Sequence, residues 1–282
     1  MKNILVAGLL TVMALPLYAA PAGSWRNANA QTSSAEKSAD AFDFEGFRSA
    51  VKTNDLPLIK EVIKGKNLNI NDADGAVPLI IAVQDGSYEV VELLIKSGAS
   101  VNYQSRRMGM TPLCSAAYKQ DIKKITLLLK YRADINKCSA LGFLMMGDRD
   151  IPGYAEYLIQ RGAHINVSGP FGLSPLAVAA AFGKPQSVTV LLKNKANINF
   201  VSSTITPLAA VVIKGIGKKG TYEMLDTLVR NGASLKLANQ ALAKGRGKDR
   251  TPLQLKYKVS NFKPQERQEA AKVIAYLNAL PK

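Results

Sequence analysis

The sequence is poor in the residues that build metal sites and covalent catalytic centres. Its 282 residues include one histidine, His164, and two cysteines, Cys114 and Cys138. A zinc site with three or four nitrogen or sulfur ligands therefore cannot form unless carboxylates complete it. Two different histidine-dependent triads cannot form either. An enzyme that uses carboxylates alone is the enzymatic alternative.

Phosphate-binding and nucleophile motifs are missing as well. The residue after Gly217-Lys218 is Lys219, and the residue after Gly247-Lys248 is an aspartate, whereas a phosphate-binding loop needs Ser or Thr there. No Gly-x-Ser-x-Gly sequence occurs. We therefore expect neither an enzyme nor a bound cofactor or metal.

Charged residues are almost absent from residues 1–22. Lys2 is the only charge, an apolar run follows it, and small residues at 20–22 offer a cleavage site. This pattern predicts a secretory signal peptide over residues 1–22, and cleavage after Ala30 is an equally good alternative. The apolar run is shorter than the ~20 residues of a membrane-spanning helix, so no span is expected in the mature chain. We expect an exported protein, in the periplasm or outside the cell.

Residues 23–41 differ from both the signal and the rest of the chain. They are rich in Ser, Ala, Asn and Gln, and Trp25 is their only aromatic residue. Such a composition buries too little apolar surface to offset chain entropy. The segment is predicted to be a disordered linker.

Two short motifs recur along the remaining chain. The first is Thr-Pro-Leu or a close variant, at residues 77–79, 111–113, 174–176, 206–208 and 251–253. The second is Ile or Val followed by Asn, and it ends at Asn71, Asn102, Asn136, Asn166 and Asn199. Successive Asn residues are thus 31, 34, 30 and 33 positions apart. A shared period near 33 residues is the signature of a repeat architecture.

The best preserved repeat runs from Thr111 to Asn136, with small residues at 116–117 and an apolar run at 125–129. The sequence resembles the ankyrin repeat family, whose repeats open with Thr-Pro-Leu-His and close with Gly-Ala-Asp-Val-Asn. The resemblance covers roughly residues 42–282. It implies an all-α ankyrin-repeat solenoid of about seven helix pairs with short hairpin fingers. An exported, bacterial member of this family is therefore expected, and the family pattern places His164 on the surface.

Several repeats depart from the pattern. The first pair, 44–64, lacks the opening motif and is expected to cap the N-terminal end. The fourth, 141–159, follows a shortened finger, and the sixth contains a basic, Gly-rich loop near 215–220. Residues 266–280 are expected to form a C-terminal capping helix. Prolines stand where second helices should begin, at Pro57, Pro152, Pro185 and Pro264.

The formal net charge of +16 favours acidic partners. Such partners are an acidic protein surface or an anionic envelope lipid or polysaccharide, with nucleic acid less plausible for an exported chain. A lysine-rich surface that only keeps the protein soluble is the alternative. We expect a monomeric scaffold that docks, inhibits or protects an acidic protein.

The resemblance also indicates where a partner would bind. Solenoids bind through a concave face made by fingers and first helices, and aromatic residues and Arg are enriched at binding hot spots. The positions that the family pattern exposes there are Tyr103, Arg106, Arg107, Met108, Met110, Tyr118, Lys119, Phe171, Leu173, Phe182, Ile205 and Lys214. Folding back of Phe171 or Leu173 under its finger is the structural alternative.

The two cysteines are expected to lie close together. Cys114 occupies the histidine position of the opening tetrapeptide, and Cys138 lies at the root of the next finger. In ankyrin repeats that side chain reaches toward the neighbouring finger, so the resemblance implies proximity. Export would permit a disulfide, and two separate buried thiols are the alternative.

Overall fold

The computed structural model describes residues 42–106, 109–203, 205–216, 218–244, 252–253, 258, 260 and 262–281. The predicted signal peptide over 1–22 and linker over 23–41 lie outside these residues. The described residues belong to two compact units. We call residues 42–170 with 174–197 the N-terminal unit, and residues 171–173 with 198–281 the C-terminal unit.

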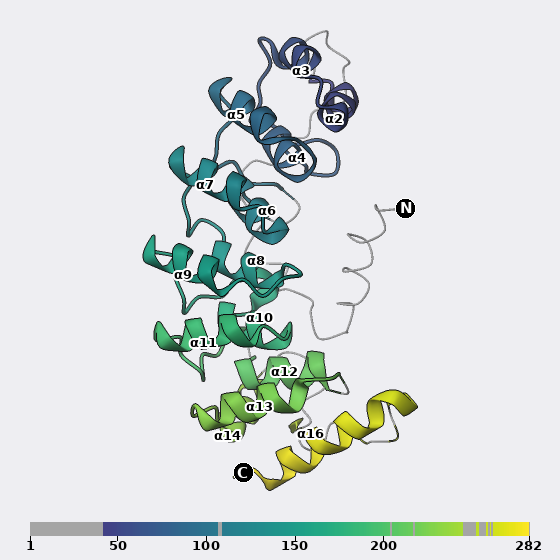
Figure 1. Cartoon of the computed structure of the whole chain (residues 1–282), viewed down its shortest axis with the longest axis vertical. Coiled ribbons are helices and arrows are strands. Elements are labelled where there is room, and N and C mark those ends of the chain that lie inside the picture. The colour runs from purple at the N-terminus through teal and green to yellow at the C-terminus, as the bar shows by residue number, and fades with distance from the viewer. Residues whose placement is uncertain are drawn as a thin grey trace. The chain divides into compact units, whose positions relative to one another are not determined.

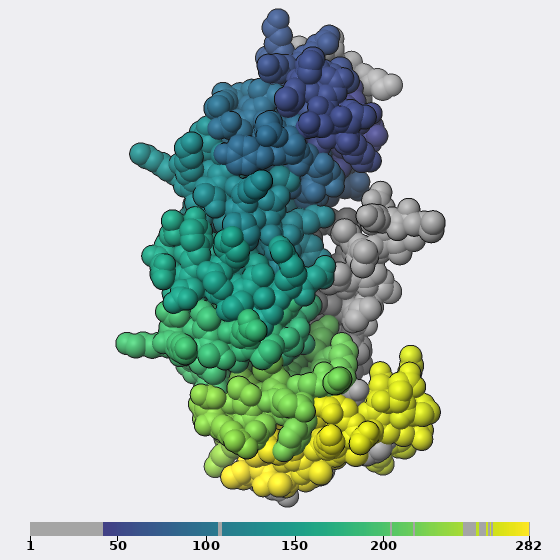
Figure 2. Space-filling view, in the orientation of Figure 1, coloured from purple at the N-terminus to yellow at the C-terminus, as the bar shows by residue number. Residues whose placement is uncertain are grey.

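The N-terminal unit consists of short helices joined in pairs. The pairs are α2 (Phe44–Thr53) with α3 (Leu56–Ile63), α4 (Pro78–Asp85) with α5 (Tyr88–Lys96), α6 (Pro112–Lys119) with α7 (Ile122–Lys130), α8 (Ala140–Met146) with α9 (Pro152–Gln160), and α10 (Pro175–Ala181) with α11 (Pro185–Lys193). The first helices pack side by side in the order α2, α4, α6, α8, α10, while α5 packs on α7 and α9 on α11 (Figure 1). Within this unit the atoms of successive pairs form one continuous surface on the face in view (Figure 2). The predicted all-α architecture is confirmed.

The recurring Thr-Pro-Leu motif forms the start of a first helix. In α6 the Thr111 hydroxyl accepts a hydrogen bond from the Cys114 backbone N–H, Pro112 occupies the first turn and Leu113 is buried. A hydroxyl cap satisfies an N–H that has no partner within the helix, and proline loses nothing there because it has no N–H. Ser174 and Thr206 cap α10 and α12 in the same way.

Three of the four prolines predicted to begin second helices do so, and the fourth begins a short 3-10 helix. Pro57, Pro152 and Pro185 lie in the first turns of α3, α9 and α11. Pro264 begins the short 3-10 helix η3 (Pro264–Glu266) that leads into the last helix. The fourth pair, α8 with α9, is complete although it lacks Thr-Pro-Leu, and every residue of α8 is buried.

A ladder of asparagine side chains joins successive repeats. Each amide group donates to a carbonyl oxygen and accepts from a backbone N–H about 30 residues further on. Asn102 bonds Arg132 O and Asp134 N at 3.4 and 2.8 Å, and Asn136 bonds Gly162 O and His164 N at 2.9 and 2.8 Å. Asn166 and Asn199 repeat the pattern further along the chain.

The first member of this ladder is Asn69, and our assignment of Asn71 was wrong. Asn69 bonds Gly98 O at 3.3 Å and Ser100 N at 2.7 Å, so the spacing to Asn102 is 33 rather than 31 residues. The preceding Leu68 is buried. Because Leu68-Asn69 and Ile70-Asn71 have the same form, only the hydrogen bonds distinguish them.

The C-terminal unit contains α12 (Pro207–Gly215), α13 (Thr221–Arg230), α14 (Leu235–Ala243), η3 and α16 (Arg267–Ala279). The predicted loop lies between α12 and α13, where the Thr221 hydroxyl bonds both Gly215 O and Lys218 O. Helix α14 was not predicted. It begins at Leu235-Lys236, where the Ile-Asn or Val-Asn motif would be expected after Gly232-Ala233; Ser234 caps the helix and Leu235 is buried. In the described part of the chain no helix is long and apolar enough to cross a membrane.

Helix α16 packs on α13 through a tyrosine pair and a carboxylate. The rings of Tyr222 and Tyr276 meet edge to face with centroids 5.2 Å apart. The Tyr276 hydroxyl donates to Asp226 Oδ1 at 3.0 Å, and Arg230 pairs with the same carboxylate. Burial and the hydrogen bond to Asp226 raise the pKa of Tyr276 to about 12.

This raised pKa makes the attachment of α16 sensitive to high pH. An unfolded tyrosine titrates near 10, so the Tyr276 contribution is complete below about pH 10 and is lost as the pH rises toward 12. We expect the protection of the α16 amides, relative to their intrinsic exchange rate at each pH, to fall over this interval, with the shifts of the Tyr276 ring carbons reporting its titration. Tyr276→Phe should remove this loss of protection and Tyr154→Phe, in the other unit, should retain it. Titration of Tyr276 near 10 would contradict the assignment.

Candidate functional site

The predicted partner-binding residues of the N-terminal unit differ in exposure. Arg106 and Lys119 are exposed, and Tyr103, Tyr118 and Phe182 are half-buried. Arg107 and Met108 lie outside the described residues. Met110 is buried. Among these residues, two cations are therefore exposed and three aromatic side chains are half-buried.

Asn71 organises the finger that carries Tyr103 and Arg106. Its side-chain amide donates to the Tyr103 hydroxyl at 3.3 Å, and its carbonyl oxygen accepts from Arg106 N at 2.9 Å. Within the finger, Gly109 N donates to Ser105 O at 2.9 Å. One asparagine of the preceding repeat thus brings Tyr103 and Arg106 together and fixes the backbone at Arg106.

Met110, Leu173 and Ile205 were predicted to be exposed, and this was wrong, because all three are buried. Each immediately precedes the Ser or Thr that caps a first helix. The finger turns back toward the core at this point. Ser105 N donates to Met110 O at 2.9 Å, and Ser202 and Ile205 form a reciprocal backbone bridge. An apolar side chain at this position is therefore part of the core.

Phe171 and Lys214 belong to the C-terminal unit and are half-buried. Phe171 has a φ of 55°, a left-handed conformation that is uncommon for a residue other than glycine. Burial, with a smaller effect from the neighbouring charge of Lys218, lowers the pKa of Lys214.

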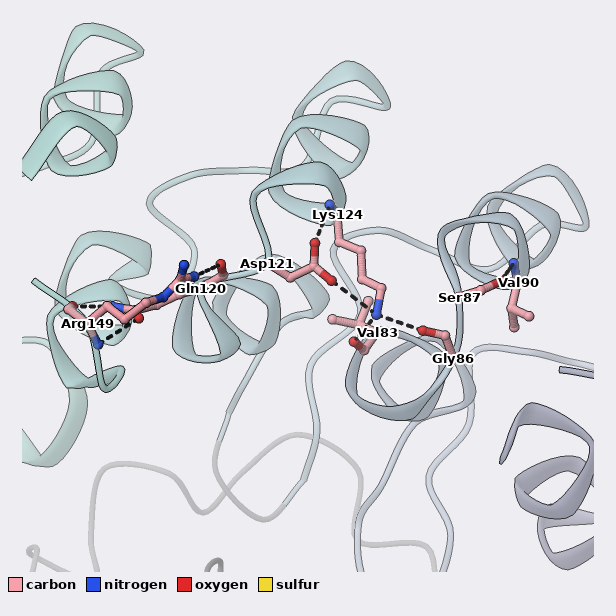
Figure 3. A network of polar contacts seen from close by, with 8 residues as sticks. All are labelled: Val83, Gly86, Ser87, Val90, Gln120, Asp121, Lys124 and Arg149. Carbon is pink, nitrogen blue, oxygen red and sulfur yellow. Dashed lines mark hydrogen bonds and ion pairs between the residues drawn. The ribbon is translucent and has the colours of Figure 1, made fainter. Parts of the chain in front are cut away.

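The turn between α6 and α7 is tied to the preceding pair by Lys124 (Figure 3). The buried ammonium group donates to Val83 O at 2.9 Å and to Gly86 O at 2.7 Å, at the carboxyl end of α4. It also pairs with Asp121, whose other carboxylate oxygen caps α7. A cation is favoured at this end of a helix because the terminal carbonyls have no partners within it.

Gln120 ties the same turn to the following pair (Figure 3). Its amide nitrogen donates to Leu144 O at 3.2 Å and to Arg149 O at 2.7 Å, and its side-chain oxygen accepts from Arg149 N at 3.0 Å. The guanidinium group of Arg149 returns a hydrogen bond to Gln120 O at 3.0 Å. The Gln120 side chain is buried, and we call these four bonds the Gln120 clamp.

Acidic residues between α8 and α9 lie close to the predicted binding set. Burial, and secondarily the charge of Asp148, raises the pKa of Tyr118. Burial lowers the pKa of Lys184, although Asp150 and Asp148 oppose this effect, and its ammonium group donates to Gly147 O at 2.6 Å. Asp150 caps α11 through Gln186 N and Ser187 N. Tyr118 is therefore influenced by the charge of Asp148, which the sequence pattern did not reveal.

Cys114 and Cys138 form a disulfide in the structure. The Cα atoms are 6.4 Å apart, within the usual range for a disulfide. Cys114 is buried in α6, and Cys138 lies in the next finger, with its sulfur 2.9 Å from the Thr111 hydroxyl. The bond thus joins the third pair to the finger that leads into the fourth.

A hollow that the sequence analysis did not predict opens between α7 and α9. It has a volume of about 450 Å³ and is lined by Thr126, Leu129, Lys130, Ala133, Ile135, Tyr157 and Arg161. We call it the α7/α9 hollow. The sequence contains one pattern that could have indicated it. Tyr154, Tyr157 and Arg161 are three and four residues apart, so they lie on one face of a helix.

Among the residues that the structure describes, no three or more His, Cys, Asp or Glu side chains come together to hold a metal ion. The arrangement offers hydrogen-bonding fingers, exposed cations and partly buried aromatic rings. These groups suit recognition of another macromolecule.

Comparison with known proteins identifies the repeat. Residues 47–138 match a family model described as ankyrin repeats in three copies. The chain is 27% identical over 180 residues to the transient receptor potential cation channel subfamily A member 1 of Drosophila melanogaster, which is 60% of this chain and 15% of that protein. It is 39% identical over 90 residues to the BTB/POZ domain and ankyrin repeat-containing protein NBCL of Lotus japonicus, which is 32% of this chain and 18% of that protein.

Solved structures share the fold. The human ASB11 ankyrin repeat domain matches with a TM-score of 0.58 at 22% identity, over 84% of this chain and 98% of that domain. An ankyrin repeat domain from Acinetobacter baumannii AYE matches with a TM-score of 0.51 at 26% identity, over 67% of this chain and 98% of that domain. The chain spans less than a fifth of the two relatives named above, so these matches concern the repeats alone.

Proposed function

Because this chain carries ankyrin repeats, which generally mediate protein–protein interaction, we propose that it is an exported scaffold that binds an acidic protein partner. The binding surface is the side of the N-terminal unit formed by the fingers and first helices. Arg106 and Lys119 supply charge there, and Tyr103, Tyr118 and Phe182 supply aromatic surface. We call these five residues the finger face.

The observation that carries this proposal is the exposed Arg106 on a finger fixed by Asn71. A preordered loop loses less entropy on binding than a mobile one. Among the described residues, the ion pairs of the N-terminal unit do not include Arg106 or Lys119. Both cations are therefore free to pair with carboxylates of a partner, and the net charge of +16 attracts such a partner at long range.

Charge reversal at Arg106 tests the role of the finger face. A partner captured by crosslinking from the exported fraction should associate more slowly with Arg106→Glu, by about tenfold at low salt. The salt dependence of association should become flatter. Stopped-flow association with the purified partner measures both. Phe182→Ala should instead speed dissociation, because aromatic anchors act mainly after encounter.

Lys60→Glu is the matched control, because Lys60 is exposed on the second helix α3 and changes the net charge equally. It should leave most of the association rate intact. Equal slowing by both variants would show a general charge effect and no finger-face site. Capture of anionic vesicles in place of a discrete protein, with the same loss in Arg106→Glu, would favour an anionic lipid as the ligand instead.

A further inference from the structure

The α7/α9 hollow has cations at its rim that the rest of the described chain does not neutralise. Lys130 and Arg161 both line it and both are exposed. Among the described residues, the ion pairs of the N-terminal unit are made by Arg48, Lys96 and Lys124, and neither rim cation takes part. No acidic side chain lines the hollow. Its charge therefore complements carboxylates.

The guanidinium group of Arg161 stacks on an aromatic ring. Its guanidinium carbon lies 3.6 Å from the centroid of the Tyr157 ring, and Tyr154 packs edge-on against Tyr157 with ring centroids 6.2 Å apart. Stacking occupies the flat face of a guanidinium group and leaves its N–H edge free for two parallel hydrogen bonds to one carboxylate. The cost of ordering this side chain is thus partly met before a ligand arrives.

Part of the lining of the hollow is apolar. Leu129 and Ile135 are half-buried, so each keeps apolar surface exposed, and Ala133 is small and buried. A volume of about 450 Å³ lies within the range of ligand-binding pockets. Helix α9 packs on α11, and the hollow opens on the other side of α9.

We propose that the α7/α9 hollow binds a short acidic peptide segment of a partner protein. An apolar side chain of the segment enters the hollow, and carboxylates next to it pair with Arg161 on one side and Lys130 on the other. This site lies on the second helices and is separate from the finger face. A partner could therefore be held at both places, or two partners at once.

The test uses the synthetic peptide acetyl-Asp-Glu-Leu-Glu-Asp-amide and the full chain, followed by amide chemical shifts. The largest changes should fall on residues that line the hollow. Arg161→Gln should weaken binding about tenfold, since a charge-assisted bidentate pair is lost. Replacing the central Leu of the peptide by Ala should weaken it by about tenfold or more, because apolar burial decreases. Lys193→Gln, an exposed charge at the end of α11, is the matched control and should change affinity less than twofold.

Three results would overturn the proposal: equal weakening by Arg161→Gln and Lys193→Gln, equal binding of a peptide with lysines in place of its acids, or changes confined to the finger face. If Arg161→Gln lost its fold, Lys130→Gln would apply the same test at the other rim. Arg106→Glu should leave this peptide bound, so failure here is distinguishable from failure of the finger face.

Discussion

Replacing both cysteines, Cys114→Ala with Cys138→Ala, is expected to destabilise the protein by about 3 kcal/mol. The disulfide closes a loop with a sequence separation of 24 residues, and the chain-entropy account assigns this amount to a loop of that length. The change should appear in urea unfolding followed by circular dichroism. The loss of local stability should be largest in α6 and α8. These helices belong to the two pairs that the disulfide connects through the finger.

Reduction supplies the control. Dithiothreitol should lower the stability of the natural chain nearly to that of the double variant and should leave the double variant unchanged. Protein unfolded without reductant should contain no titratable thiol. Two titratable thiols would mean that Cys114 and Cys138 are separate, and the expected loss would then be limited to the packing of two small side chains.

Gln120→Ala should cost about 2–3 kcal/mol, because the side chain makes three of the four hydrogen bonds of the Gln120 clamp and each is worth about 1 kcal/mol. Loss of the clamp should also uncouple the fourth pair from the third, since repeats are stabilised by their neighbours. Amide exchange should therefore accelerate in α8 and α9 before it does in α4 and α5.

Two comparisons distinguish the effect of losing the Gln120 clamp from the effect of the left-handed backbone conformation. Gln120 has a φ of 53°, so Gln120→Gly removes the same side chain but relieves the left-handed conformation, and it should be less destabilising than Gln120→Ala by about 1 kcal/mol. Asn54 ends α2 with a φ of 56° and is exposed. If Asn54→Ala cost as much as Gln120→Ala, the backbone and not the clamp would be responsible.

Much of the fold could be predicted because the residues that begin a helix can be recognised in the sequence. Thr111-Pro112-Leu113 combines a cap, a residue without an N–H and a buried side chain, and these roles do not depend on distant parts of the chain. Asn69 and Asn71 show where prediction from the sequence fails. Both follow an apolar residue, and only the positions of Gly98 and Ser100 decide which one joins the ladder.

The binding surface was harder to predict because it depends on which way side chains turn. Met110 and Ile205 both lie in fingers, yet both are buried where the backbone of the finger turns back through hydrogen bonds to Ser105 and Ser202. The α7/α9 hollow combines residues of two repeats, Lys130 and Arg161, that have no shared sequence motif. Helix α14 was missed because the family pattern places a finger there, while Leu235, Ala238 and Leu242 already follow a helical spacing.

The asparagine ladder gives the molecule a direction. The Asn102 side chain forms hydrogen bonds with the turn at Arg132 and Asp134, and the Asn136 side chain does so with the turn at Gly162 and His164. Each amide of the ladder therefore bonds a turn that lies further toward the C-terminus. Shortening the chain from its C-terminal end leaves exposed amide side chains that water solvates. Shortening it from the N-terminal end deprives backbone groups of the next turn of their partners. Synthesis proceeds from the N-terminus. Each asparagine of the ladder is therefore made before the turn whose backbone it bonds.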